Sequence, residues 1–181
     1  METKIVFKTI KKEEISAEIN KTLTDLLQLL TLFGEEQINV IPFEGSWTAG
    51  QLAKHVLMSN LGFIEIINGT FKETQRQPDE MVQKIKTDFL DFSTKGQSAD
   101  NLKPPLIDYN KNELLISFES LKEKTNQAIE ISDLTKTCTA FELPVYGFLT
   151  RWEALHFILY HTQRHIHQLK NIFKKLETSN H

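Results

Sequence analysis

The length, composition and charge of the chain limit what it can be. It has 181 residues, of which 40% are hydrophobic and 25% charged, with a formal net charge of −3; this is typical of one globular domain without the basic surplus that a nucleic-acid backbone requires. The single cysteine excludes an internal disulfide framework and a cysteine-rich metal site.

No targeting or membrane-spanning segment is expected. The N-terminus lacks the apolar core of a signal peptide, and no apolar run approaches the ~20 residues of a membrane span. We therefore expect a cytoplasmic protein with no membrane contact and no nucleic-acid partner. A single domain should cover residues 1–181, with a polar tail from about residue 177.

Two amphipathic helices are predicted in the first part of the chain. The first covers residues 13–33, where apolar residues recur at a spacing of three and four up to Gly34. The second begins at Thr48, which can form a capping box with Gln51. It should end at residues 68–69, Asn-Gly, which tolerate a left-handed backbone conformation.

Residues 70–109 form the least regular part of the sequence. A short helix fits residues 79–92, with Met81, Ile85, Phe89 and Phe92 on its inner face. Residues 94–98 and the Pro-Pro pair at 104–105 are typical of loops. A connection of this length fits a crossover or a functional rim in a helical bundle.

Two further long helices are predicted in the second half. One covers residues 111–131, and the other starts at Thr150, where Glu153 completes a second capping box, and runs to about residue 176. Residues 137–146 between them favour an extended connector or a short strand. The sequence thus predicts an all-α four-helix bundle with an irregular connection between helices two and three.

Three histidines form a candidate metal site. His161 and His165 lie four residues apart on the last helix, so their rings point the same way. His55 lies on a flank of the second helix beside the small residues Ser59 and Gly62, which leave space next to it. Together the three could line a cleft and bind one metal ion with open coordination positions. A surface position or an ordinary hydrogen bond is the alternative for each.

Four other residues of the last helix have simpler explanations than chemistry. Helix geometry places His156 and His167 on the flank opposite His161, so we expect them at the surface or at an interface. Arg151 and Arg164 could hold an anionic substrate, but surface ion pairs are favoured for both.

The remaining candidates are aromatic, acidic or thiol side chains. Trp47 and Trp152 could form an aromatic wall, although core packing is favoured for each. Glu65 is expected to be solvated, and Cys138 to be an inert buried thiol without a partner base.

Two segments resemble motifs of the DinB-like superfamily of four-helix-bundle proteins. The first, WTAGQLAKHV, covers residues 47–56 at the entry to the second helix, and the second, YHTQRHIHQL, covers residues 160–169. Members typically carry a tryptophan before the second helix, one histidine within it, and two histidines four apart late in the fourth. This chain has all of these, and the resemblance extends over nearly its whole length.

The resemblance implies a cofactor and a class of activity. A divalent metal ion, nickel or zinc, would bind to His55, His161 and His165, with water completing the shell. Characterised members include S-transferases that use bacillithiol and an isomerase that uses mycothiol. A metal-dependent thiol transferase or hydrolase acting on a small electrophile, with a low-molecular-weight thiol as cosubstrate, is therefore expected, although the sequence shows no recognisable thiol-cofactor pocket.

A non-catalytic role is the alternative to an enzyme. The chain would then be a stress-related metal-binding or dimeric interaction module. The resemblance also implies a homodimer, for which Ile64, Phe157 and Tyr160 could supply an exposed apolar patch.

Overall fold

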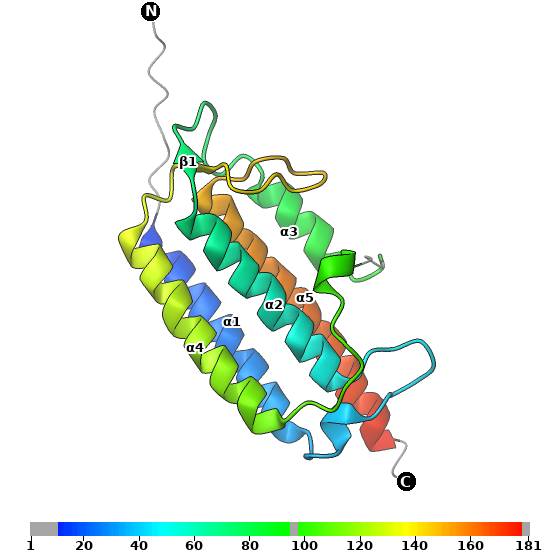
Figure 1. Cartoon of the computed structure of the whole chain (residues 1–181). Helices are drawn as coiled ribbons and strands as arrows, with labels where there is room; N and C mark the ends of the chain where they lie inside the picture. Colours follow the sequence, from blue (N-terminus) through cyan, green and yellow to red (C-terminus); the bar gives the residue numbers. More distant parts are fainter. Residues whose placement is uncertain (1–10, 95–97, 179–181) are drawn as a thin grey trace, which may run out of the picture.

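The computed structural model describes residues 11–94 and 98–178, and these are mostly helical (Figure 1). The long helices are α1 (Lys12–Leu32), α2 (Ala49–Asn68), α4 (Lys111–Ile131) and α5 (Arg151–Thr178). The short elements are the helix α3 (Val82–Leu90), the 3₁₀ turns η1 (Gln37–Asn39) and η2 (Asp100–Leu102), and the strands β1 (Phe71–Lys72) and β2 (Thr137–Cys138). The expected all-α chain is thus correct apart from a small two-stranded sheet.

The long helices lie side by side around one apolar core (Figure 1). α5 packs against α1 and α2, and α4 packs against the same two helices. The core residues Ile19, Val56, Phe118 and Leu155, one from each long helix, are almost fully buried. α3 adds to this arrangement by packing along α5. No helix within the described residues is long and apolar enough to cross a membrane.

Both predicted capping boxes are present, and they fix where α2 and α5 begin. The Thr48 hydroxyl accepts from the Gln51 amide at 3.0 Å, and the Thr48 amide donates to Gln51 Oε1 at 3.1 Å. Thr150 and Glu153 make the same pair of bonds at 3.1 and 2.9 Å. Each box satisfies two amides that a helix N-terminus would otherwise leave unpaired.

The glycine that ends α2 serves a different purpose from the one expected. Gly69 has a φ of −77°, so it does not adopt a left-handed conformation. A Cβ at this position would lie 3.0 Å from the Ala140 Cβ and 3.1 Å from the Glu65 carbonyl oxygen. The residue is therefore small because the connector before α5 passes close to the end of α2.

The connection between α2 and α4 is partly as predicted. α3 is shorter than the expected helix; Ile85 is buried, Met81 and Phe89 are half-buried, and Phe92 is exposed rather than inward. β1 was not predicted, and its residue Phe71 pairs with Cys138 of β2. Part of the expected 94–98 loop lies outside the described residues.

The last helix extends slightly beyond its expected end near residue 176. α5 continues to Thr178, although residues 177 and 178 are exposed as a polar tail would be. Residues 179–181 lie outside the described part of the chain.

The apolar patch proposed for dimerisation is not exposed. Ile64 and Tyr160 are buried, and Phe157 is half-buried with its ring stacked on Phe63 at 4.1 Å. Ile64 is covered because α2 packs against α4 and α5, and the two α5 residues are covered because α5 packs against α1, α2 and α3. That part of the sequence-based hypothesis is wrong.

A buried carboxylate connects the start of α5 to the segment before α3. Glu153 is fully buried, and its carboxylate accepts hydrogen bonds from both terminal nitrogens of Arg76, at 2.5 and 2.7 Å. It also accepts from the backbone amides of Met81 and Thr150, at 2.8 and 2.9 Å. Because every acceptor direction of the carboxylate is used, the charge is compensated in place.

Replacing Glu153 by glutamine should destabilise the fold strongly. The change leaves the Arg76 guanidinium beside a neutral amide, and breaking a buried ion pair costs roughly 3–5 kcal/mol. Arg76 is 26% exposed, which favours the lower end of that range. Urea unfolding measures the loss. Lys21→Ala, which removes an exposed pair with Asp25, should cost less than about 1 kcal/mol; equal losses in the two variants would contradict this account of Glu153.

Candidate metal centre

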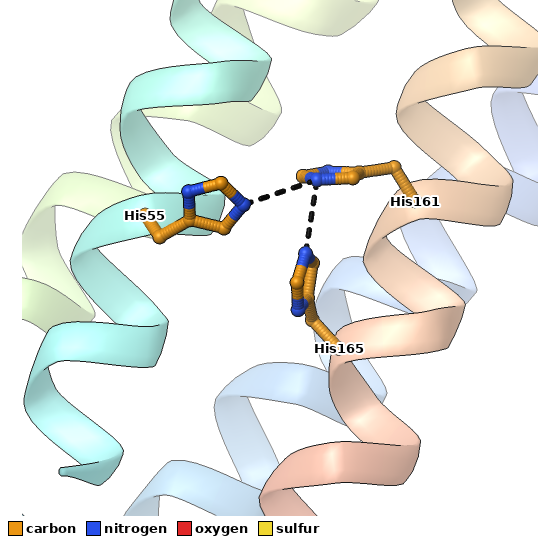
Figure 2. Close-up of side chains that lie close together, drawn as sticks. All are labelled: His55, His161 and His165. Atoms are coloured by element: carbon orange, nitrogen blue, oxygen red, sulfur yellow. Dashed lines mark hydrogen bonds between the residues drawn. The ribbon is translucent and has the colours of Figure 1, made fainter. Parts of the chain in front are cut away.

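The structure brings His55, His161 and His165 to one point (Figure 2). The Nε2 atom of His161 lies 3.2 Å from Nε2 of His55 and 2.9 Å from Nε2 of His165. Two turns of α5 and one face of α2 supply the rings. The side chains are only 4%, 6% and 8% exposed, so this cluster is enclosed by the fold.

The outer nitrogens of two of these rings are held by oxygen atoms. His55 Nδ1 lies 2.9 Å from the Leu102 carbonyl oxygen, and His165 Nδ1 lies 2.7 Å from Oε1 of Gln168. An oxygen acceptor requires a proton on Nδ1, which in a neutral imidazole leaves a lone pair on Nε2. Both lone pairs therefore point toward His161, whose own Nε2 can donate to only one of them.

Burial keeps the three imidazoles neutral. It is the main cause that lowers the pKa of His55 and holds the pKa of His161 well below its usual value. It also lowers the pKa of His165 to about 3, and the nearby His55 acts in the same direction. Neutral imidazole is the form that binds metal ions.

The cluster fits a divalent metal ion. Three ring nitrogens converge on one point. A single N–H group of His161 cannot satisfy the lone pairs of both His55 and His165. Among the described residues the cluster includes no carboxylate or thiolate, so the protein would leave the full charge of the ion uncompensated. Such a donor set suits zinc, nickel, copper or iron.

His161 differs from the other two in its surroundings. Its Nδ1 atom is buried and has no hydrogen-bond partner among the described residues. The ring instead contacts the rings of Phe89 and Phe157, at centroid distances of 5.5 and 5.7 Å. The outer side of this histidine is therefore aromatic.

A segment after α3 covers the His55 side of the cluster. Besides the Leu102 carbonyl, the Ser98 hydroxyl lies 3.4 Å from His55 Nδ1, and Gln51 donates to the Pro104 carbonyl at 3.4 Å. Trp47, which packs against the core as predicted, also contacts the His55 ring at a centroid distance of 5.2 Å. The tryptophan is thus part of the site wall as well as of the core.

The two arginines of α5 are not surface ion pairs. Arg164 is buried and donates to the carbonyl oxygens of Phe89, Asp91 and Thr94, which lie at and just after the C-terminal end of α3. Arg151 is also buried and donates to the Ile67 carbonyl at 2.8 Å. Both have structural partners because the ends of α2 and α3 present unpaired carbonyls toward α5.

The remaining two α5 histidines stay apart from the cluster. His167 is exposed, as expected, and stacks on Phe92 at 4.1 Å. His156 is only 8% exposed, so its expected surface position is wrong; its Nδ1 donates to the Trp152 carbonyl at 2.9 Å. The physical reason is that the flank of α5 away from the cluster is also covered by neighbouring elements.

The other candidate residues are placed as expected. Glu65 is exposed. Trp152 packs against the core. Cys138 is buried, and its burial raises the pKa of the thiol to about 11, so it is unreactive at neutral pH.

Sequence reasoning missed the partners that orient the histidines. Gln168 could have been found, because it follows His165 by three residues on the same helix face. The Leu102 carbonyl could not, since backbone oxygens carry no sequence signal.

Lowering the pH should destabilise the metal-free protein. The folded-state pKa of His165 lies near 3, below the ~6.5 of the unfolded chain. The unfolded state therefore binds more protons between these values, and stability falls as the pH drops below 6.5. At pH 5 this one group should cost about 2 kcal/mol relative to pH 7.5. Urea unfolding of the metal-free protein at both pH values measures it.

The variant His165→Gln should show a smaller loss between the two pH values than the wild type. The control His167→Gln removes an exposed histidine and should leave the loss unchanged. If His165→Gln and the wild type lose the same stability, the buried neutral imidazole is not the cause.

Comparison with known families identifies the chain. A family model described as the DinB superfamily matches residues 18–169, a stretch that contains all three clustered histidines. Comparison with curated proteins and with solved structures gives no match. Because the match covers most of the sequence, the chain belongs to the DinB superfamily.

Proposed function

We propose that the protein is a divalent-metal-dependent enzyme that transfers a low-molecular-weight thiol to a small electrophile. Its metal, nickel or zinc, would bind to Nε2 of His55, His161 and His165, and its long helices would form the four-helix bundle of the family. The observation that carries the proposal is the convergence of three neutral, buried imidazole nitrogens.

The chemistry follows from the donor set. A divalent ion held by three neutral ligands lowers the pKa of a bound thiol or water. In the proposed reaction the thiol loses its proton, and its sulfur forms a bond to a carbon of the electrophile. The carbon–oxygen bond of an epoxide, or a carbon–halogen bond, breaks at the same time; the alkoxide takes up a proton, or the halide departs.

The protein contributes orientation and exclusion of bulk water. Leu102 and Gln168 fix the tautomers and ring positions of His55 and His165. Since the three rings are at most 8% exposed, electrostatic interactions among them are little screened by solvent.

The enclosure of the histidines favours a second candidate function. A non-catalytic, stress-related metal-binding module would need the site closed by packing, and Trp47 together with residues 98–104 covers the His55 side. The two candidates differ in one property, which is whether a small thiol and an electrophile reach the cluster.

Replacing His161 by alanine should abolish tight metal binding and thiol transfer. The ring lies between the other two, so its loss removes the donor that both of them approach. Elemental analysis of untagged wild-type protein should find about one nickel or zinc per chain, as expected for a single three-ligand site. Transfer of bacillithiol or mycothiol to 1-chloro-2,4-dinitrobenzene should be measurable in the wild type alone.

Two other histidine variants serve as controls. His167→Ala removes an exposed ring and should leave metal content and stability unchanged. His156→Ala should keep the metal but lower stability, because that ring is buried. Metal retained by His161→Ala would refute the proposed site. Metal bound by the wild type without any thiol transfer would support the non-catalytic module.

We also propose that the protein forms homodimers. The basis is the resemblance to a superfamily in which many members dimerise, and the interface lies outside the buried residues Ile64 and Tyr160. Light scattering at micromolar concentration should give twice the mass of one chain. A single species with the mass of one chain would reject the dimer.

A further inference from the structure

Aromatic side chains form a wall beside the histidine cluster. The ring of Phe157, one helical turn before His161, lies between Phe63 at 4.1 Å and Phe89 at 4.7 Å. Both Phe89 and Phe157 contact the His161 ring. Phe89, Phe157 and the neighbouring Tyr146 are only half-buried, so this aromatic wall is partly open to solvent.

On the flank of α2 next to the aromatic wall, Gly62 leaves open space. Gly62 follows His55 by seven residues, or about two turns, and therefore lies on the same flank. A Cβ added at Gly62 would have no heavy atom within 4 Å. Because α2 and α5 run in opposite directions, Gly62 and Phe157 lie on the same side of the cluster. Residues 98–104 cover the His55 end instead.

The charged groups next to the aromatic wall already have partners. Lys84, whose amine lies 5.1 Å from the Tyr146 ring centre, is paired with Asp88 at 2.7 Å. Asp88 also accepts from the Tyr146 hydroxyl at 2.7 Å. Arg164 is used by three carbonyl oxygens. Because these three charged groups are already paired, the wall offers mainly apolar contact to a ligand.

One polar group beside the wall is unused. His161 Nδ1 is buried without a partner among the described residues, and the phenyl rings that contact the His161 ring are those of Phe89 and Phe157. When Nε2 of a neutral histidine binds a metal ion, Nδ1 carries the proton and needs an acceptor.

We infer that the aromatic wall binds the body of the substrate, and that this substrate is small and uncharged, with an aromatic or alkyl group next to one acceptor oxygen. The inference rests on the proposed function and names the class of its electrophile. The apolar body would pack on Phe157 and Phe89 from the open side at Gly62. With the metal on His161 Nε2, the oxygen would accept from His161 Nδ1.

The test measures binding of acetophenone, an unreactive probe, to metal-free protein by calorimetry and saturation-transfer NMR. The wild type should bind it saturably. Gly62→Phe fills the open space and should weaken binding by at least about tenfold, a difference of 1.4 kcal/mol. The matched control Glu65→Phe places the same ring on the exposed side of α2 and should change binding less than about twofold.

Two further probes separate the parts of the inference. Ethylbenzene, which lacks the oxygen, should bind zinc-loaded protein more weakly than acetophenone does, because zinc on Nε2 leaves the proton of His161 on Nδ1. The charged benzoate should not bind the metal-free protein. Equal affinities of the wild type and Gly62→Phe, or no saturable binding of acetophenone, would overturn the inference. Equal binding of ethylbenzene and acetophenone to the zinc-loaded protein would overturn the role of His161 Nδ1.

The metal-free assay keeps this inference separate from the proposed function. Gly62→Phe should retain wild-type metal content, since the residue lies two turns from His55. If the wild type lacks metal or thiol transfer, the proposed function fails, while probe binding still reports on the aromatic wall. If Gly62→Phe loses its metal, the residue belongs to the cluster and the assignment of a separate wall is wrong.

Discussion

α2 and α5 pack against each other in opposite directions, and the convergence of the three histidines follows from that contact. It sets Phe63 against Phe157 and, further along, His55 against His161 and His165. A shift of one residue along either helix would turn its flank by about 100° and take the histidine away from its partners. The site therefore depends on the axial register of two helices that lie about a hundred residues apart in the sequence.

Buried polar contacts hold this register, because apolar packing alone tolerates sliding better than hydrogen bonds do. In the middle of the interface, the Asn60 amide donates to the Thr162 hydroxyl at 2.9 Å. At the end of α2, Arg151 binds the Ile67 carbonyl. At the start of α5, Glu153 ties the helix to Arg76 and Met81. Each contact is specific in direction and costly to leave unpaired, so together they specify one alignment.

The histidine cluster is a destabilising element that the surrounding fold must support. Three imidazoles are enclosed in an apolar environment, where the charged form is disfavoured. His161 Nε2 can satisfy only one of the two lone pairs that face it, and its buried Nδ1 has no partner among the residues that the structure describes. Local imperfections of this kind are expected where a protein reserves groups for a ligand. The half-buried Phe89 and Phe157 beside the cluster are a further departure from complete packing.

The sequence by itself determined what depends on neighbours along the chain. Capping boxes at Thr48 and Thr150 set the starts of α2 and α5, and the i, i+4 spacing of His161 and His165 put both rings on one flank. Only the tertiary structure decided what depends on distant segments. His156 is buried, and Arg164 binds a carbonyl oxygen at the end of α3. The Leu102 carbonyl lies against His55, and Gly69 is needed because the connector before α5 passes close to the end of α2. The physical reason is that the spacing of residues along a helix sets the side of the helix on which each side chain lies. Whether that side is buried, and which backbone acceptors it meets, depends on the other element that packs against it.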